Sequence, residues 1–579
     1  MKKLADTCEQ IAATTRKLEK ITLVAAYFQS CIRHEAAVSA VFLSGRPFPV
    51  WEQTTLQVGG RLLWRVVEEL SGKSENDLGA AYRRHGDLGS VAGEVLPPNH
   101  PTSALSVGEV LERFRSIAAA RGPAAKSALV RELLAQARPL EAKYLVKIMT
   151  GDLRIGLKES LVEEAVAEAY DVAPAEVQRA NMLLGDIGET LGLAADRKLG
   201  REQMAGIKMR VFHPLGFMLA SPAESAEQAL GYFANALVED KYDGIRAQVH
   251  CSGDEVRIFS RTRDDITESF PELADGLVGF SQDVILDGEI AAWDYADAGG
   301  RALPFSALQQ RLGRKKVSAE MMRSVPVAYL AFDVLSAGGE LLIDRPLRQR
   351  AGILDQLLKE KAGGRPDRGA RREPKKGEQA RLGFASQEET FPAQLVRAPE
   401  FQASTPQELD RLFQAAQARG NEGLMIKDPE SVYTPGRRGK SWLKLKRELA
   451  TLDVVVTAVE YGHGKRIGVL SDYTFAVREG DRLVNIGKAY SGLTDVEIAE
   501  MTKWFLQHVI EDQGFRLIVA PEIVLEVAFN NMMESDRHES GYALRFPRIV
   551  RLRPDKLPED ADTVERAREI YQGQGNALP

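Results

Sequence analysis

Apolar residues recur at helical spacing through about the first 205 positions of the chain. In segment 158–171 they lie three and four positions apart and form one stripe, made of Leu161, Val162, Ala165, Val166 and Ala169. Segments 128–137 and 177–185 follow the same pattern, and Gly185 is typical of a residue that ends a helix. We therefore expect residues 1–205 to form an all-α domain.

Two glycine-bearing loops, 150–157 and 185–189, separate these expected helices. Backbone N–H groups in such loops can bind a phosphate chain, but loops that only connect helices have the same composition. The connector interpretation is favoured, and phosphate binding stays open.

Beyond residue 206 the hydrophobic period changes from helical spacing to alternation. After an irregular linker at 212–222, strand-like runs separated by turn residues dominate, at 246–250, 255–260, 283–286, 289–293, 327–335, 423–428 and 442–446. Helical patterns at 348–358 and 406–420 interrupt the strands. This alternation predicts a mixed α+β domain over residues 206–446.

A polar segment at 359–383 interrupts this domain. It carries nine basic and four acidic side chains, five glycines and almost no apolar residue. Such a composition predicts a solvated, flexible insertion, and holding DNA by its charge is the less favoured alternative.

A second strand-rich block begins at about residue 447. The spacing of its alternating runs suits a small β-barrel of the OB-fold type over residues 447–579. Gly462, Gly464 and Gly468 match a dinucleotide-binding loop only superficially, because no βαβ pattern surrounds them. We expect them to lie in a loop of the barrel.

Length and composition set broad limits on the protein. A chain of 579 residues exceeds one hydrophobic core, so a multidomain protein is expected. The net charge of −6 does not exclude nucleic acid, because a local basic face is enough to bind phosphates. Three dispersed cysteines exclude a four-cysteine zinc site and suit a reducing cytosol. The longest apolar stretch, 325–335, is too short to span a membrane, so we expect a cytoplasmic protein.

The segment Lys241-Tyr242-Asp243-Gly244-Ile245-Arg246 carries the sharpest chemical signal. A lysine amine can attack a phosphorus atom, but its ordinary pKa of about 10.4 makes it a poor nucleophile at neutral pH. Nearby cations and burial lower such a pKa, and Arg246, Lys444 and Lys446 are candidates for that field. Alone, Lys241 would be taken for a surface lysine.

Other candidate residues follow along the α+β domain. Alternation places Lys444 and Lys446 on one strand face, which suits a triphosphate or simply solvent. Glu289 and Glu422 are carboxylates that can bind Mg²⁺ or ribose hydroxyls. Asp287-Gly288, just before Glu289, equally predicts a hairpin turn. Phe332 is either a core residue or an aromatic that stacks on a base.

These motifs, in this order, resemble those of ATP-dependent DNA ligases of the archaeal and eukaryotic replicative type, which are covalent nucleotidyltransferases. The motif-like segments are 241–246, Arg261, 287–290, 331–335, 422–427, 442–446 and 545–556. Segments 143–157 and 213–222 are similar to that family's helical DNA-binding domain and its junction with the catalytic domain. The resemblance covers essentially the whole chain and implies a helical DNA-binding domain, an adenylation domain and an OB-fold domain.

The resemblance also implies residue roles. Lys241 would carry AMP, Glu239 would contact the adenine, and Phe332 would stack on it. Glu289 would bind ribose and metal, and Glu422 would help to hold metal. The cations around the nucleotide would be Arg246, Arg261, Arg438, Lys444 and Lys446. Asp555 and Lys556 would orient the departing pyrophosphate.

The implied reaction seals nicks in double-stranded DNA during replication, recombination and repair. AMP passes from ATP to the lysine, then to the 5′-phosphate at the nick, and leaves when the 3′-hydroxyl attacks, with Mg²⁺ and cations stabilising the charge. DNA binding is expected to be independent of sequence and sensitive to salt. We expect a monomer and, because the chain begins with helix-like sequence, no sliding-clamp motif.

Three other classes fit less well. NAD⁺-dependent ligases carry zinc-binding cysteines that this sequence lacks. Capping enzymes and RNA ligases share the lysine motif but lack the long helical domain. A non-catalytic nick-binding protein would not be expected to retain Lys241, Glu289, Glu422, Lys444 and Lys446 together.

Overall fold

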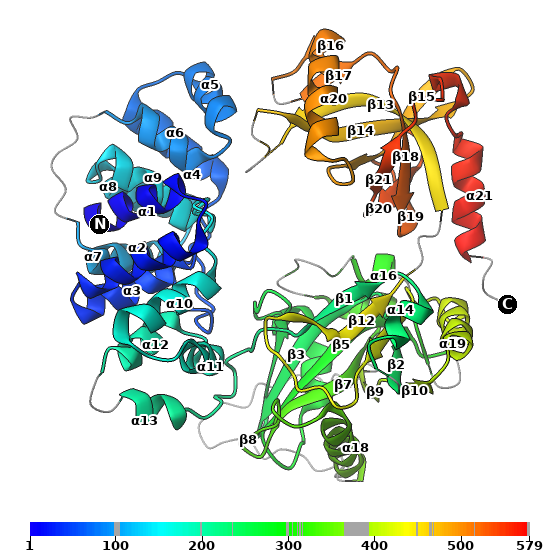
Figure 1. The fold of residues 1–579 in the computed structure, drawn as a ribbon, viewed down its shortest axis with the longest axis horizontal. Helices are drawn as coiled ribbons and strands as arrows, with labels where there is room; N and C mark the ends of the chain where they lie inside the picture. Colours follow the sequence, from blue (N-terminus) through cyan, green and yellow to red (C-terminus); the bar gives the residue numbers. More distant parts are fainter. Residues whose placement is uncertain are drawn as a thin grey trace, which may run out of the picture.

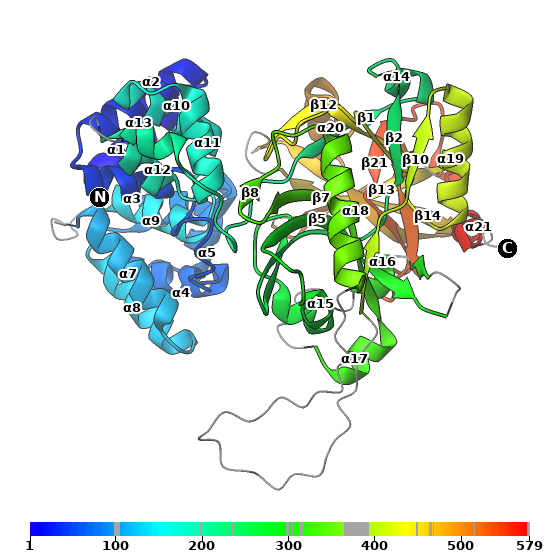
Figure 2. The same cartoon turned by 90° about the horizontal axis from the view of Figure 1, so that it is seen from below.

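The computed structural model describes the chain as three lobes (Figure 1). The described residues are 1–575 except 98–104, 197–199, 234, 297–299, 304, 310, 312–313, 315–316, 364–392, 447–449, 463–465, 467 and 515. A helical lobe, an α+β lobe and a strand-rich C-terminal lobe follow one another along the sequence, and Figure 2 shows them from below. Among the described helices, none combines the length and apolar character needed to cross a bilayer.

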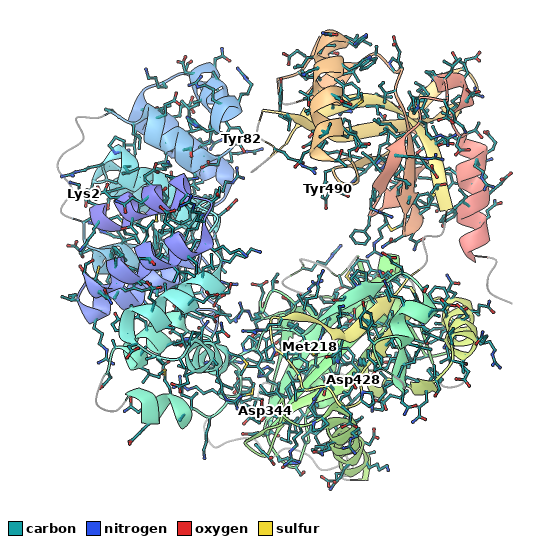
Figure 3. The ribbon with its side chains drawn as sticks, in the orientation of Figure 1. Lys2, Tyr82, Met218, Asp344, Asp428 and Tyr490 are labelled. Atoms are coloured by element: carbon teal, nitrogen blue, oxygen red, sulfur yellow. The ribbon has the colours of Figure 1, made fainter. Side chains whose placement is uncertain are left out.

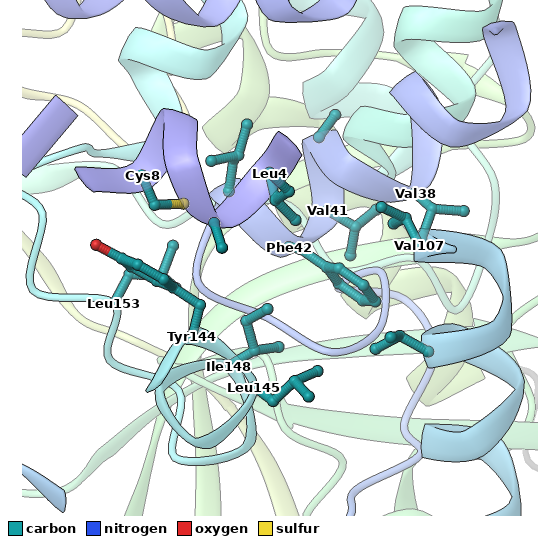
Figure 4. Packing of buried hydrophobic residues seen from close by; sticks show 14 of the residues in the cluster. Leu4, Cys8, Val38, Val41, Phe42, Val107, Tyr144, Leu145, Ile148 and Leu153 are labelled. Atoms are coloured by element: carbon teal, nitrogen blue, oxygen red, sulfur yellow. The ribbon is translucent and has the colours of Figure 1, made fainter. Parts of the chain in front are cut away.

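The N-terminal lobe is built from helices around one apolar core. Its helices are α1 (Lys2–Ala13), α2 (Lys17–Gln29), α3 (Arg33–Leu43), α4 (Gly60–Ser71), α5 (Glu75–His85), α6 (Leu88–Val95), α7 (Val107–Ala119), α8 (Pro123–Ala135), α9 (Pro139–Met149), α10 (Glu159–Tyr170), α11 (Pro174–Leu184), α12 (Ile187–Ala194) and α13 (Gly200–Ala205). Figure 4 shows part of the core, where Phe42 and Tyr144 lie among aliphatic side chains from several helices.

Two sequence predictions are confirmed in this lobe. All five residues of the apolar stripe in α10 are buried. Gly185 ends α11 with a φ of 66°, and Asp186 begins α12 by accepting hydrogen bonds from the N–H groups of Gly188 and Glu189. Because Asp186 occupies those two donors, loop 185–189 is a connector.

The α+β lobe contains two sheets. One has the order β1 (Leu219–Ala223), β12 (Arg438–Leu445), β11 (Leu424–Lys427), β2 (Ala236–Asp240) and β10 (Glu400–Ala403). The other has the order β4 (Glu255–Ser260), β3 (Ile245–Ser252), β5 (Val284–Asp294), β7 (Val327–Ala337) and β8 (Glu340–Leu341), with β6 (Arg301–Ala302) beside β5 and β9 (Ala393–Arg397) beside β7. The helices are α14 (Ala226–Leu230), α15 (Pro271–Leu277), α16 (Phe305–Gln309), α17 (Ala319–Ser324), α18 (Leu347–Gly363) and α19 (Pro406–Ala418).

Two expectations for this lobe need correction. Asp287-Gly288 is not a turn, because β5 runs straight through it. Glycine is needed there because a Cβ atom would lie 2.5 Å from the Leu330 carbonyl oxygen on β7. The expected insertion at 359–383 begins too early, since α18 continues to Gly363, and its remaining residues lie outside the described part of the chain.

The C-terminal lobe has one larger antiparallel sheet, which curves around the core of the lobe, and a separate two-stranded sheet. Its strands are β13 (Ala450–Tyr461), β14 (Leu470–Glu479), β15 (Arg482–Ala489), β16 (Val509–Asp512), β17 (Arg516–Val519), β18 (Val524–Phe529), β19 (Asn531–Glu534), β20 (Tyr542–Arg545) and β21 (Arg548–Leu552), with helices α20 (Asp495–Gln507) and α21 (Val564–Gly575). The long β13 pairs with β14, β17 and β18, so the sheet bends around it. Gly462 and Gly468 lie in the connection between β13 and β14, as expected for a loop of this lobe.

The helical lobe contacts the α+β lobe through polar side chains. Arg179 pairs with Asp344 at 2.8 Å, and Figure 3 labels Asp344 at the edge that faces the helical lobe. Gln53 Oε1 accepts a hydrogen bond from the N–H of Asp265 at 2.7 Å. A cavity of about 540 Å³ lies at this seam, between the loop at 46–59 and the turn of Arg263.

Candidate nucleotide-binding active site

Lys241 lies where the chain crosses from one sheet of the α+β lobe to the other, between β2 and β3. Its N–H donates to the carbonyl of Gly423 at 2.8 Å, and its carbonyl accepts from the N–H of Glu422 at 2.9 Å. The side chains also meet, because the Lys241 ammonium lies 2.5 Å from Glu422 Oε2. Backbone pairing therefore fixes this lysine beside this carboxylate.

A cluster of further cations surrounds the pair. Lys446 shares the Glu422 carboxylate with Lys241. The pKa of Lys444 is lowered by partial burial and by the nearby charges of Lys241, Arg438 and Arg261. Leu443 and Leu445 are buried while Lys444 remains half-exposed, so the predicted alternation of β12 is confirmed. Several positive charges thus converge on one small region, as an anionic ligand requires.

Two carboxylates near Lys241 differ in protonation. Burial opposes ionisation of Glu422, but Lys241 and Lys446 lower its pKa to about 2. Burial raises the pKa of Glu289 to about 7 despite Lys241 and Arg246 nearby. No cluster of three metal-binding side chains occurs among the described residues. A metal ion held here would therefore need ligand oxygens from phosphate or water, which is usual for Mg²⁺.

Behind this cluster lies a buried pair that the sequence did not reveal. The Lys427 ammonium donates to Glu239 Oε2 at 2.6 Å, and it lies 4.4 Å from the ring centres of both Phe332 and Trp442. The second carboxylate oxygen, Glu239 Oε1, is buried without a hydrogen-bond partner. Buried polar atoms are normally paired, so this acceptor suits a donor from a ligand.

Arg246 is held inside the protein by several acceptors. Its guanidinium binds both Asp287 oxygens, at 3.1 and 2.7 Å, and donates to the Met218 carbonyl at 2.6 Å. Tyr433 donates to the same Asp287 at 2.7 Å. The Arg246 guanidinium also lies over the Phe332 ring, and its contact with nucleotide stays a prediction.

The C-terminal lobe reaches this site through a different residue from the ones expected. Arg545 donates to Asp243 Oδ2 at 2.9 Å and lies 4.2 Å from the ring centre of Phe305. Lys556 instead binds Asp453 at 2.6 Å within its own lobe. The expected role of Asp555 and Lys556 at pyrophosphate stays a prediction.

Comparison with known proteins agrees with this geometry. Residues 217–446 match the family model of the ATP dependent DNA ligase domain, 1–167 match the DNA ligase N terminus, and 466–556 match the ATP dependent DNA ligase C terminal region. A probable DNA ligase of Koribacter versatilis is 62% identical over 99% of this chain and 97% of its own length. The DNA ligases of Methanopyrus kandleri and Archaeoglobus fulgidus are 34% and 33% identical, over 98% of each chain. The chain belongs to the ATP-dependent DNA ligase family.

Membership fixes the reaction. This family seals nicks in DNA with ATP as co-substrate and Mg²⁺ as the usual metal, through a lysine–AMP intermediate. The three-lobe architecture is also shared with the solved structure titled Pmar-Lig_PreS3, with a TM-score of 0.59 and 15% identity over 95% of this chain and 99% of that one. The helical lobe is thus the N-terminal domain, and the α+β lobe is the adenylation domain.

Several residues of the site escaped the sequence prediction. Lys427 binds the predicted site residue Glu239, and Asp287, Tyr433 and Trp442 all contact the predicted Arg246. Lys427 lies inside the predicted run 423–428, where a charged residue within a strand that is otherwise apolar was an available signal. Asp287 belongs to the motif-like segment 287–290, whose first two residues equally suit a hairpin turn.

Proposed function

We propose that Lys241 is the residue that receives AMP, in a ligase that acts on nicked double-stranded DNA. The observation that carries this assignment is the position of Lys241 within 2.5 Å of Glu422, inside the cluster of cations around β12. Lysine needs a neutral amine to attack phosphorus. Phosphates that bind the neighbouring cations bring the reacting phosphorus close to the Lys241 amine.

The nucleotide is proposed to lie with its base on Phe332 and with its exocyclic amino group at Glu239. This placement is supported by the unpartnered Glu239 Oε1 and by the half-buried ring of Phe332. The ribose would bind Glu289 and lie near Arg246. The triphosphate would face the cations, which are Arg261, Arg438, Lys444 and Lys446.

The two carboxylates proposed to hold Mg²⁺ are Glu289 and Glu422. They fit because Glu422 stays ionised and because Glu289, with a pKa near 7, becomes anionic when a cation approaches. Mg²⁺ supplies neutralisation of phosphate charge when bound. Lys241 and Lys446 would then exchange their contact with Glu422 for contacts with phosphate oxygens.

The chemistry assigned to this chain proceeds in three transfers. Lys241 Nζ forms a bond to the α-phosphorus of ATP while the bond to pyrophosphate breaks. The 5′-phosphate of the nick next takes AMP from Lys241, and finally the 3′-hydroxyl attacks that phosphate and releases AMP. The cations stabilise negative charge on the phosphate oxygens in each transfer.

We also propose the finer architecture. The domains would span residues 1–205, 206–446 and 447–579, the last being an OB-fold. This is supported by α13 ending at Ala205, by β12 ending at Leu445, and by the curved antiparallel sheet around β13. The protein is proposed to act as a monomer.

Labelling with ATP tests the assignment directly. The full chain is incubated with α-labelled ATP and Mg²⁺, and protein-bound label is measured in wild type, Lys241→Ala and Lys440→Ala. Lys440 lies on the same strand as Lys444, over the ring of Tyr232, and serves as the matched control. We expect label in wild type and the control only. Label on Lys241→Ala, or none on wild type, would contradict the proposal, and GTP and NAD⁺ arms test the donor.

A further inference from the structure

Strand β3 carries a row of polar side chains, two of which, Gln248 and His250, lie outside the proposed nucleotide site. Arg246, Gln248 and His250 alternate along β3 and therefore point to one face of its sheet. Each of them binds the backbone of the segment that joins the helical domain to the adenylation domain. We name residues 212–218 the strap.

The contacts occur at regular intervals. The N–H of Phe212 donates to His250 Nδ1 at 3.0 Å. Gln248 binds Leu215 twice, accepting from its N–H at 3.0 Å and donating to its carbonyl at 2.9 Å. Arg246 donates to the carbonyl of Met218, which Figure 3 labels within the adenylation domain. Alternate residues of β3 therefore form hydrogen bonds with residues three positions apart in the strap, namely Phe212, Leu215 and Met218.

Two members of the row, Gln248 and His250, are buried against the strap. Gln248, His250 and Leu215 are each 0% exposed. Since His250 Nδ1 accepts a hydrogen bond, the imidazole is neutral there, and its Nε2 faces Gln248 Oε1 at 3.4 Å. Side chains supply the partners that a neighbouring strand would otherwise supply, because the strap itself forms no strand until β1.

The opposite side of the strap binds the helical domain. His213 Nδ1 lies 2.9 Å from the carbonyl oxygen of Leu184 at the end of α11. The Trp51 indole stacks on the His213 ring, with centres 5.2 Å apart. Adjacent residues, Phe212 and His213, therefore bind two different domains.

We propose that Gln248 and His250 are positioning residues for nick sealing. By fixing the strap to β3, they would set the place of the helical domain, which we propose to bind the DNA duplex, relative to Lys241. The inference rests on the proposed role of Lys241 in the adenylation domain. It assigns no role in the first transfer, since neither residue belongs to the proposed nucleotide site.

Three substitutions separate positioning from simple packing. Gln248→Leu removes both bonds to Leu215 at similar volume, and His250→Leu removes the acceptor for Phe212. His250→Asn keeps an acceptor oxygen near the place of Nδ1 and is the conservative rescue. Val249→Ala is the matched control, because Val249 is buried between them in the core of the domain and does not contact the strap through a polar group.

Two activities are measured for each full-length variant. One is the rate of protein labelling by α-labelled ATP without DNA, and the other is nick sealing and nicked-DNA affinity of the purified lysine–AMP form. We expect Gln248→Leu and His250→Leu to weaken nicked-DNA binding about tenfold, as for loss of one to two hydrogen bonds, with labelling changed less than about twofold. His250→Asn should restore most of the affinity. Val249→Ala should lower thermal stability and leave the ratio of the two activities unchanged.

Each result decides between the two interpretations. Equal losses of labelling and sealing in Gln248→Leu, or the same selective loss in Val249→Ala, would overturn the inference. His250→Asn behaving as His250→Leu would overturn the part that concerns His250. Failure of the Lys241 assignment is seen separately, as label on Lys241→Ala or absence of label on the wild type, while nicked-DNA affinity still reports on the strap.

Discussion

Arg545 of the C-terminal domain donates a hydrogen bond to Asp243 at 2.9 Å. Asp243 lies two positions after Lys241, and 302 positions separate it from Arg545 in the chain. Both side chains are largely buried, with 16% and 15% of their surface exposed. Burial and the neighbouring Glu422 raise the pKa of Asp243 to about 6, and Arg545 opposes that rise. The contact therefore fixes the C-terminal domain directly on the loop of the proposed nucleophile.

Replacing Arg545 by alanine should impair sealing more than labelling. Truncating one partner of a desolvated ion pair costs on the order of 2–5 kcal/mol, so we expect sealing by the lysine–AMP form to slow by at least about tenfold. The rate of protein labelling by ATP is measured for the same variant, and we expect it to fall less than the sealing rate. Arg482→Ala, at an exposed position on β15, is the control. Equal sealing by Arg545→Ala and wild type would show that the docking contact has no part in the later transfers.

Replacing Lys427 by methionine should weaken ATP binding. The change leaves the buried Glu239 without its cation, and loss of one partner from a buried pair costs on the order of 3–5 kcal/mol. We expect the ATP concentration for half-maximal labelling to rise at least about tenfold.

The double variant Lys427→Met with Glu239→Gln tests the cause. Because the glutamine leaves no buried charge, stability should recover relative to Lys427→Met, while ATP discrimination over GTP should not. A double variant that is as unstable as Lys427→Met alone would contradict the ion-pair explanation. Thermal unfolding and competition labelling measure the two effects.

The neutral His250 predicts a loss of stability in acid. Burial, and to a lesser degree the charge of His213, lower the pKa of His250 from 6.5 to about 3. Another nearby charged group is the guanidinium of Arg257, which packs on the ring of Phe212, the residue bound to His250. Between these values the unfolded chain binds more protons than the folded one, so stability is present above pH 6.5 and is lost as the pH falls toward 3. Urea unfolding of His250→Asn should show a shallower fall over that window. If the unfolding free energies of variant and wild type fell equally with pH over that window, His250 would not be the cause of the acid sensitivity.

The sequence predicts those parts that depend on local patterns. Helix α10 has its stripe buried because 3.6-residue periodicity is a local property, and Leu443 and Leu445 are buried because alternation is equally local. Lys241 and Glu422 were predicted separately from short motifs, and strand pairing explains their contact.

Long-range contacts escaped prediction for a physical reason. Glu239 and Lys427 are 188 positions apart and meet only because β2 and β11 pair in one register. The strap looked like an irregular linker because its partners are side chains of β3 rather than backbone groups. Gly288 also suited a turn in the sequence. A glycine that a turn needs and a glycine that the close approach of a neighbouring strand needs look identical in sequence, and only the structure shows that Gly288 is of the second kind.

Glu289 predicts a stability trend opposite in sign to that of His250. Burial raises its pKa from 4.5 to about 7, so between these values the folded protein binds more protons than the unfolded chain. Its contribution to stability is thus complete below about pH 4.5 and is lost as the pH rises through 7. Glu289→Gln, which stays neutral, should raise the unfolding free energy at pH 8 by on the order of 1 kcal/mol, discounted for partial exposure of the side chain.

The labelling activity of the wild type should rise with pH, whereas the stability contributed by Glu289 falls with pH. If the ionised form of Glu289 binds ribose and metal, labelling by ATP should rise with pH through about 7 in wild type and be low and flat in Glu289→Gln. Glu255→Gln, on the exposed end of β4, is the control and should keep the wild-type pH profile and stability. Urea unfolding at pH 5 and pH 8, with labelling rates over the same range, measures both effects. A Glu289→Gln variant that labels with the wild-type pH profile would remove Glu289 from the proposed nucleotide site, whatever its effect on stability.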